Sequence, residues 1–298
     1  MGEERYAVVT GANRGIGLAV VRRLASEGIT VVLTARDESR GLEAVADLKS
    51  RGLTTVIFHQ LDVTDPASVA SLADFIRSQF GRLDILVNNA GASGIIADEE
   101  GLRALQIDPD CWLSGRAHKL VQGVLQYTPE KAEECLETNY YGCKRVSEAL
   151  IPLLQNSTCA RIVNVSSLRS ELRRIPNEQI REEFGDLDSL TEEKLDSLVQ
   201  RFLCDFKDDK LEANGWPNML PAYSISKVAL NAYTRVLAKK FPTMCINCVH
   251  PGFVKTELNW NTGVLTVEEG AEGPVMLALL PPNGPSGHYF HQMEMASF

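Results

Sequence analysis

Short runs of β-branched and aliphatic residues alternate along most of the chain with segments whose apolar residues recur at helical spacing. The runs are typical of strands, and the spaced segments, such as 68–81 and 130–154, are typical of helices. Strands that alternate with helices predict a parallel sheet covered on both faces. We therefore expect an α/β fold with a doubly wound, parallel, seven-stranded Rossmann sheet. Its strands are predicted at 6–10, 30–35, 54–61, 83–87, 160–165, 244–249 and, with a weaker pattern, 288–291.

Two segments interrupt this alternation. Residues 168–222 carry no strand pattern but include a charged helical pattern at 190–209, so they are predicted to form a helical insertion. Residues 92–128 form a second stretch without regular periodicity. The chain has no internal repeat and no low-complexity linker, which favours a single domain over 1–298.

Three glycines separate the first predicted strand from the first predicted helix, namely Gly11, Gly15 and Gly17. At the carboxyl end of a parallel strand, such a turn lets backbone N–H groups and the helix N-terminus approach a pyrophosphate. The spacing G-x3-G-x-G departs from the G-x-G-x-x-G fingerprint of dinucleotide-binding turns. Taken alone, the motif therefore also fits an ordinary glycine-rich turn.

The residues after the second strand favour NADPH over NADH. About 20 residues beyond a dinucleotide-binding turn, an acidic side chain usually binds the ribose 2′-hydroxyl of NAD. This chain has Arg36 there, with Arg40 one turn on and Arg14 in the glycine turn, and three guanidinium groups would suit a 2′-phosphate. Asp37 is the alternative, because its carboxylate would accept the 2′-hydroxyl if Arg36 faced solvent. Further cofactor contacts are expected at the ends of the third and fourth strands, with ordinary turn residues as the alternative. These stretches are Leu61, Asp62 and Val63, and Asn88, Asn89, Ala90 and Gly91.

Tyr223 and Lys227 stand four residues apart at the start of a predicted helix, which places both side chains on one face. A tyrosine phenol has a pKa near ~10, and an adjacent ammonium is expected to lower this pKa. Lys227 would also reach the ribose of the nicotinamide half of the cofactor. Ser167 follows the fifth strand and would hold the substrate oxygen, with Ser166 as the alternative. Each residue alone has an ordinary structural interpretation, but the set favours a catalytic site.

Asn139 is the only polar residue in a helical stripe formed by residues 136, 139, 143, 146, 150 and 153. A polar amide in an apolar seam needs hydrogen-bond partners, because leaving it unpaired costs about 1–3 kcal/mol. We expect Asn139 to anchor a water that relays protons to Lys227. A purely structural role, tying the helix to the sheet, is compatible with that function.

Composition and charge exclude several other classes of protein. The chain has 298 residues, 44% of them hydrophobic, and its net charge of -9 argues against a nucleic-acid-binding surface. No apolar run reaches the roughly 18 residues of a membrane span, so a soluble, cytoplasmic protein without membrane partners is expected. Cys245 and Cys248 form a CxxC inside a strand pattern and have no second ligand pair nearby. They are predicted to be core cysteines, and no metal site is expected.

These motifs resemble those of the short-chain dehydrogenase/reductase family over nearly the whole chain. TGANRGIG stands at the cofactor turn, NNAG follows the fourth strand, and HPGFVKT follows the sixth. The resemblance implies that the catalytic residues are Asn139, Ser167, Tyr223 and Lys227. It also implies cofactor contacts from Gly11, Asn13, Arg14, Gly15, Ile16, Gly17, Arg36, Arg40, Asp62, Val63, Asn88, Ala90, Gly91, Tyr223, Lys227, Pro251, Gly252, Val254 and Thr256.

The insertion before Tyr223, the phrase TNYYGCKRV and the carboxyl-terminal region resemble the carbonyl-reductase-like branch, and within it plant reductases of terpenoids and alkaloids. Members of this branch are typically monomeric and NADPH-dependent, so the resemblance implies an NADPH cofactor and a monomer. The expected reaction is reversible hydride transfer to a ketone of a small, largely apolar molecule. Two alternatives stay open. The first is reduction of an enone double bond, which one plant member of the branch carries out with a glutamate in place of the tyrosine. The second is a non-catalytic NADPH-binding sensor.

The walls of the substrate pocket are expected from the insertion, from residues 92–128 and from the loop around Trp260. Hydrophobic candidates for these walls are Ile95, Trp112, Met219 and Trp260, which would equally suit local core positions.

Overall fold

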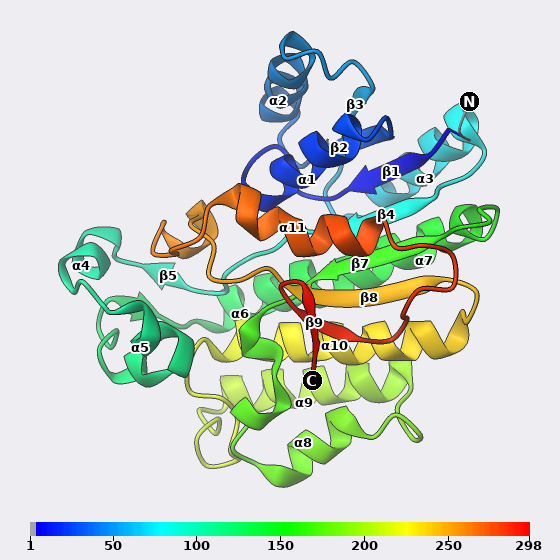
Figure 1. Ribbon diagram of the computed structural model, residues 1–298. Coiled ribbons are helices and arrows are strands. Elements are labelled where there is room, and N and C mark those ends of the chain that lie inside the picture. The colour runs from blue at the N-terminus through cyan, green and yellow to red at the C-terminus, as the bar shows by residue number, and fades with distance from the viewer. Residues whose placement is uncertain (1–3) are drawn as a thin grey trace.

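The computed structural model describes residues 4–298 and has a central sheet of eight strands (Figure 1). The strand order is β10-β9-β8-β7-β4-β1-β2-β3, and every neighbouring pair is parallel except β9 and β10. This confirms the α/β fold with a doubly wound parallel sheet. The seven predicted strands are β1 (Tyr6–Val9), β2 (Thr30–Ala35), β3 (Val56–Gln60), β4 (Ile85–Asn88), β7 (Arg161–Val165), β8 (Cys245–His250) and β9 (Tyr289–His291).

The eighth strand, β10 (Glu294–Ala296), departs from the prediction of seven. It pairs antiparallel with β9 after a tight turn in which Gln292 has a φ of 56°. Two of its three side chains are exposed and the third is half-buried, so the strand lacks the buried alternation that would reveal it in the sequence.

Helices cover both faces of the sheet, and each face has its own hydrophobic core. Helices α1 (Gly15–Ser26), α2 (Glu38–Ser50) and α11 (Val267–Ala278) pack on one face. The other face is covered by α3 (Pro66–Phe80), α6 (Pro129–Leu136), α7 (Cys143–Leu154) and α10 (Pro221–Lys240). Within residues 4–298, no helix combines the length and the apolar character that crossing a bilayer requires.

A buried chain of polar side chains fixes α7 and α10 on the sheet. Asn88 Nδ2 donates to Ser147 Oγ (3.0 Å) and to Asn164 Oδ1 (2.9 Å). Asn164 Nδ2 donates in turn to Thr234 Oγ1 (2.8 Å). Because a buried amide without partners is costly, this network allows little shift of α10 relative to β4 and β7. It thereby fixes the position of the helix that carries Tyr223 and Lys227.

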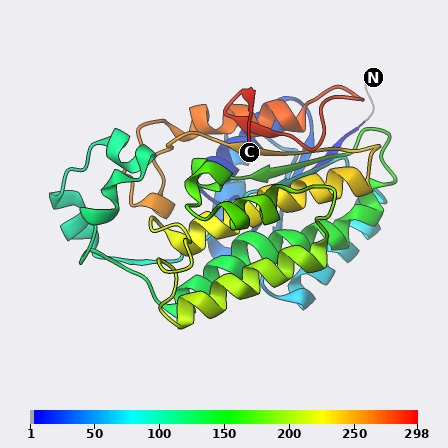
Figure 2. The same cartoon turned by 90° about the horizontal axis from the view of Figure 1, so that it is seen from below.

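The predicted insertion contains two short 3-10 turns, η3 (Leu168–Ser170) and η4 (Leu172–Arg174), followed by α8 (Glu178–Gly185) and α9 (Glu192–Lys207). Figure 2 shows α9 as a layer outside α10 and α6, farther from the sheet. The Asp196 carboxylate of α9 accepts hydrogen bonds from the Tyr140 hydroxyl and from Lys144 Nζ, both at 2.8 Å. The insertion is therefore attached to the α6–α7 region by polar contacts as well as by its apolar face.

The 92–128 segment forms a small unit beyond the carboxyl ends of the strands, on the left of Figure 1. It is more regular than its sequence predicts, because it holds a two-stranded antiparallel ribbon and short helices around its own apolar cluster. Its elements are β5 (Ile96–Ala97), α4 (Glu99–Ala104), α5 (Pro109–Ser114), η1 (Arg116–Lys119) and β6 (Leu125–Gln126). Each is too short to give a periodic pattern.

Gly273 offers a direct test of the packing of α11 on the sheet. A Cβ at this position would lie 2.5 Å from the Gln292 carbonyl oxygen and 2.9 Å from a methyl group of Val249. We expect Gly273→Ala to lower the free energy of unfolding by about 1–3 kcal/mol, because the backbone of the β9–β10 turn must move. Thermal unfolding measures the effect. Glu272→Ala, on the exposed side of the same helix, is the control and should melt like the wild type; an unchanged melting temperature for Gly273→Ala would contradict this packing.

Candidate active site

The glycine turn brings the backbone of β1 and α1 into close contact with the end of β4. Gly11 has a φ of 60°, and a Cβ there would lie 2.8 Å from Ala90 Cα. A Cβ on Gly17 would lie 2.5 Å from Asn89 Nδ2 and 2.9 Å from the Gly11 carbonyl oxygen. Helix α1 begins at Gly15 with neither a side-chain cap nor an acidic residue in its first turn. Its first backbone N–H groups are therefore available to a phosphate.

Thr10 and Asn89 hold this turn in place. Thr10 was not predicted as a site residue, and Asn89 was predicted only as part of the fourth strand end. The buried Thr10 hydroxyl accepts hydrogen bonds from the backbone N–H groups of Asn89 (2.9 Å) and Ala90 (3.0 Å). Asn89 Nδ2 donates to the carbonyl oxygens of Thr10 and Gly11, both at 3.0 Å. Asn88, which was predicted as a cofactor contact, instead turns its side chain into the buried network beneath the sheet edge. The NNAG motif was the signal for Asn89, but sequence alone does not tell which of the two asparagines faces the turn.

The arginines predicted at the 2′-phosphate lie at exposed positions on the β1 and β2 edges of the site. Asp37 caps α2, because its carboxylate accepts the Arg40 backbone N–H at 3.0 Å. This engagement weighs against the alternative in which Asp37 binds a ribose hydroxyl. Arg14 is paired with Glu257 from the loop after β8. Asp62 stabilises its own turn by accepting from the backbone N–H and the hydroxyl of Thr64.

Lys227 is almost fully buried and lies one turn beyond Tyr223 on α10. Its side chain is 4% exposed, and its Nζ donates to the Val165 carbonyl oxygen at 2.8 Å. The same Nζ lies 5.7 Å from the centre of the Tyr223 ring. A Cβ on Gly91 would lie 4.0 Å from it, so the loop after β4 also approaches the ammonium.

The two candidate serines at the end of β7 have different surroundings. Ser166 is buried, and its hydroxyl donates to Asn231 Oδ1 at 2.5 Å. Ser167 is half-buried and caps the η3 turn by accepting the Arg169 N–H at 3.1 Å. Its hydroxyl also acts on the Tyr223 phenol and lowers the pKa of that phenol. Ser167 is therefore the serine that can share a substrate oxygen with Tyr223.

Burial changes the acidity of both α10 groups, and the prediction for Tyr223 is wrong for the protein alone. Burial raises the pKa of Tyr223 to about 12, and the Ser167 hydroxyl and the charge of Arg169 offset this only in part. Burial also lowers the pKa of Lys227 to about 8. The spacing of Tyr223 and Lys227 indicates an ammonium beside the phenol but not the loss of water around both groups, which is the larger effect here.

Asn139 lies in a π-helical turn, η2 (Glu137–Gly142), between α6 and α7 rather than in the continuous helix predicted for 130–154. Its Oδ1 accepts the Ala92 N–H (2.7 Å), and its Nδ2 donates to the Ala92 carbonyl oxygen (3.0 Å) and to Ser226 Oγ (2.9 Å). The amide thus ties the loop after β4 to α10. A small cavity of about 10 Å³, lined by residues that include Asn139, Lys227 and Thr10, is close in size to one water molecule.

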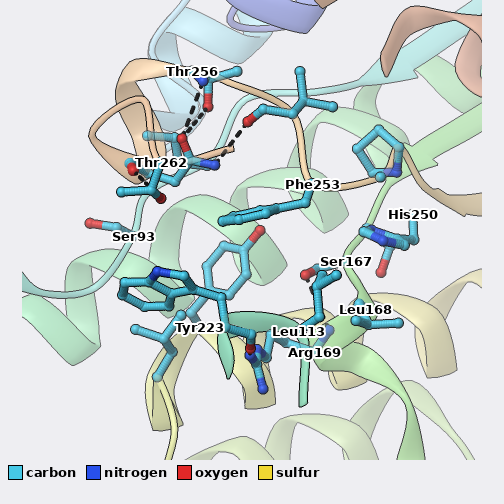
Figure 3. A pocket seen from close by; sticks show the side chains of 18 of the residues that line it. Ser93, Leu113, Ser167, Leu168, Arg169, Tyr223, His250, Phe253, Thr256 and Thr262 are labelled. Carbon is cyan, nitrogen blue, oxygen red and sulfur yellow. Dashed lines mark hydrogen bonds between the residues drawn. The ribbon is translucent and has the colours of Figure 1, made fainter. Parts of the chain in front are cut away.

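A cavity of about 150 Å³, called the Tyr223 cavity below, opens beside Tyr223 and Ser167 (Figure 3). Its walls include Ile95, Trp112 and Trp260, as predicted. Met219 is not among the lining residues; it packs in the core of the 92–128 segment, and its neighbour Leu220 lines the cavity instead. Other lining residues are Ile16, Pro251, Gly252, Val254 and Thr256, which were predicted to contact the cofactor, together with His250 and Phe253.

Comparison with known proteins identifies the family. Residues 5–179 match the family model described as short chain dehydrogenase. The chain belongs to this family.

The dehydrogenase has relatives that span its full length. It is 54% identical to "Short-chain dehydrogenase/reductase 1" of Saponaria officinalis, over 100% of this chain and 97% of the relative. It is 52% identical to (+)-neomenthol dehydrogenase of Arabidopsis thaliana, over 100% of both chains. The solved structure of salutaridine reductase from Papaver somniferum is 50% identical, with a TM-score of 0.90 over 97% of this chain and 99% of that one. The chain is therefore an oxidoreductase of the carbonyl-reductase-like group that the resemblance indicated.

The cofactor turn of this dehydrogenase fits a dinucleotide. Gly11 and Gly17 leave no room for a side chain between the turn and β4, and the uncapped start of α1 suits a pyrophosphate. A further relative, Carbonyl reductase [NADPH] 3 of Mus musculus, is 39% identical over 95% of this chain and 94% of the relative, and its name specifies NADPH. Within residues 4–298, no group of His, Cys, Asp and Glu side chains is arranged to hold a metal ion.

The different surroundings of the two serines give opposite expectations for their alanine variants. Ser167→Ala should lower the turnover of a cyclic ketone with NADPH by about 100-fold, because a substrate contact is lost. Its free energy of unfolding should fall by no more than about 1 kcal/mol, because only the cap of the short η3 turn is lost. Ser166→Ala should lower the free energy of unfolding by about 1–2 kcal/mol with a smaller effect on turnover, because Asn231 loses its donor. An NADPH oxidation assay and a thermal melt on both variants check this, and the reverse pattern would assign the substrate contact to Ser166.

Proposed function

We propose that the protein is an NADPH-dependent ketone reductase that converts a ketone of a small, largely apolar molecule to a secondary alcohol, reversibly. The observation that carries this proposal is the arrangement of three groups at one cavity. Tyr223 and Ser167 line the cavity together, and Lys227 lies behind Tyr223, bound to the end of β7. A proton donor, an oxygen-binding hydroxyl and a buried cation are the groups that ketone reduction requires of the protein.

NADPH is the proposed cofactor, held by the glycine turn, by the start of α1 and by Arg14, Arg36 and Arg40. When bound, it supplies the hydride. The engagement of Asp37 as the cap of α2 supports a 2′-phosphate over a free 2′-hydroxyl at this position. Arg14 would exchange Glu257 for the phosphate, which its exposed position allows.

The protein's own part in the reaction is to hold the ketone oxygen and to move one proton. Ser167 donates a hydrogen bond to the ketone oxygen, and the Tyr223 phenol transfers its proton to the same atom. The Lys227 ammonium stabilises the resulting phenolate across the 5.7 Å that separates it from the ring centre. Asn139 positions the loop after β4, and a water in the cavity beside Lys227 would carry the replacement proton.

The substrate class rests on the cavity and on the relatives. The lining is mostly aliphatic and aromatic, with Trp112, Phe253 and Trp260 among its members. One relative is named for neomenthol and another for salutaridine, at 52% and 50% identity to this chain. Relatives with about 50% sequence identity to this chain are thus named for different compounds. Sequence similarity therefore supports a terpenoid-like or alkaloid-like ketone as the substrate but does not identify the compound. We also propose a monomer, because α9 covers the outer surface of α10 and α6.

The removal of the Tyr223 hydroxyl tests the proposal. Tyr223→Phe should lower the turnover of a cyclic ketone by about 100-fold to 10,000-fold, because the proton donor is lost. Tyr141→Phe, which removes a hydroxyl hydrogen-bonded to Gln200 outside the cavity, is the matched control and should retain full turnover. NADPH oxidation gives the rate, and product identification with an α,β-unsaturated ketone gives the bond that is reduced.

Three results of that experiment would contradict the proposal. Near-normal turnover by Tyr223→Phe would remove the tyrosine from its role. A saturated ketone as the product would indicate reduction of the double bond. Tight NADPH binding without oxidation over a broad ketone panel would indicate a sensor rather than an enzyme.

The pH dependence of ketone reduction should follow Lys227. Burial lowers the pKa of Lys227 to about 8 and raises the pKa of Tyr223 to about 12, so as pH rises the ammonium is lost while the phenol keeps its proton. The turnover number for reduction is therefore expected to fall as pH rises through about 8. Lys239→Met, which removes an exposed lysine, is the control and should keep the same profile. A turnover number that stays flat to pH 9.5 would show that Lys227 keeps an ordinary pKa or that its charge is not used.

A further inference from the structure

Of the described residues that line the Tyr223 cavity, Arg169 is the one with a charged side chain. Within residues 4–298, no aspartate or glutamate lines this cavity, so none of these residues places a carboxylate there to balance the guanidinium. His250 lines the same cavity, but burial lowers its pKa to about 3, so its imidazole is neutral at physiological pH. The electrostatic character of the cavity is therefore set by a single positive charge.

The backbone holds Arg169 close to the reacting groups. Arg169 is two residues beyond Ser167, and its N–H donates to the Ser167 hydroxyl at 3.1 Å. Its Nη2 donates to the carbonyl oxygen of Trp112, which fixes the guanidinium between the insertion and the 92–128 segment. Its charge acts on the Tyr223 phenol and lowers the pKa of that group against the larger effect of burial. Figure 3 shows Arg169 below Ser167 and Leu113.

The nearby acidic residue is already engaged by other arginines. Glu171 pairs with Arg173 at 2.8 Å and with Arg174 at 3.1 Å. Arg174 also donates to the Leu113 carbonyl oxygen at 2.9 Å. Among residues 4–298, Arg169 forms no ion pair, although burial lowers its pKa to about 10. With that pKa the guanidinium keeps its charge at neutral pH, in surroundings where a charge without a counter-ion is costly.

We propose that Arg169 is a substrate-binding residue, and that the protein prefers ketones that carry a carboxylate or a similar anionic group over neutral ketones and over ketones that carry a protonated amine. This inference rests on the proposed function, because it treats the cavity beside Tyr223 as the place where the ketone binds. The guanidinium would form charge-assisted hydrogen bonds with the anionic group, while the aromatic walls hold the carbon skeleton. A protonated amine in the same cavity would face uncompensated repulsion.

Three ketones that share one ring test the preference. They are 4-oxocyclohexanecarboxylate, cyclohexanone and protonated 4-(dimethylamino)cyclohexanone, assayed with NADPH at pH 7. We expect kcat/KM to fall in that order in the wild type, by about tenfold or more at each step. Arg169→Gln should remove the order, so that the kcat/KM values of the three ketones in this variant lie within about threefold of one another. Arg169→Lys should restore part of the preference for the carboxylate, and Arg173→Gln, at an exposed arginine of the same segment, should keep the full order.

A binding measurement separates this inference from the proposed function. Cyclohexanecarboxylate cannot be reduced, so its affinity for the NADP⁺-loaded protein, measured by ligand-observed NMR, does not require turnover. We expect it to bind the wild type at least tenfold more tightly than cyclohexanol, and Arg169→Gln to abolish the difference. Equal binding of the two compounds by the wild type, or an unchanged carboxylate preference in Arg169→Gln, would overturn the role of Arg169. Failure to reduce any of the three ketones, with carboxylate binding intact, would instead count against the proposed function.

Discussion

The buried hydrogen bond between the Lys227 ammonium and the Val165 carbonyl oxygen is the interaction on which the rest of the site depends. It joins α10 to the carboxyl end of β7 at a buried point. Tyr223 lies one turn earlier on the same helix, and Ser167 lies two residues beyond Val165 on the same chain segment. One bond therefore fixes the relative positions of the cation, the phenol and the hydroxyl. The same burial lowers the pKa of Lys227 to about 8, so the charge responds to pH in the physiological range.

Other contacts in the fold hold the segments around this hydrogen bond in position. The buried amides of Asn88 and Asn164 attach α10 and α7 to the central strands, and Asn139 attaches the loop after β4 to α10. The insertion lies outside α10 and also provides Arg169 and Leu220 to the cavity. The 92–128 segment closes the other side through Trp112 and Ile95. Segments far apart in the sequence therefore meet around one small volume, with rigid strands beneath and less regular elements above.

The sequence predicted those features that require a particular residue type or spacing within a short segment. Parallel strands leave apolar runs, a tight turn against β4 demands glycine at Gly11 and Gly17, and a four-residue spacing brings Tyr223 and Lys227 to one side of α10. These features depend on residues that are close together in the chain. The parallel α/β class, the glycine turn and the motif residues were therefore predictable from the sequence. The three-residue strand β10 has no such trace, because its side chains are mostly exposed. The π-turn at Asn139, the place of Leu220 rather than Met219 and the raised pKa of Tyr223 follow from tertiary packing and loss of water, which spacing does not encode.

The titration of the Lys227 ammonium is the most direct test of this account. Heteronuclear NMR on lysine-labelled protein, with Lys227→Arg for assignment, follows the group without any need for turnover. A midpoint near pH 8 is expected, because burial disfavours the charged form while the Val165 carbonyl oxygen retains it in place. A midpoint near the ordinary lysine value of 10.5 would show that the ammonium faces water, and it would contradict the arrangement from which the proposed chemistry follows.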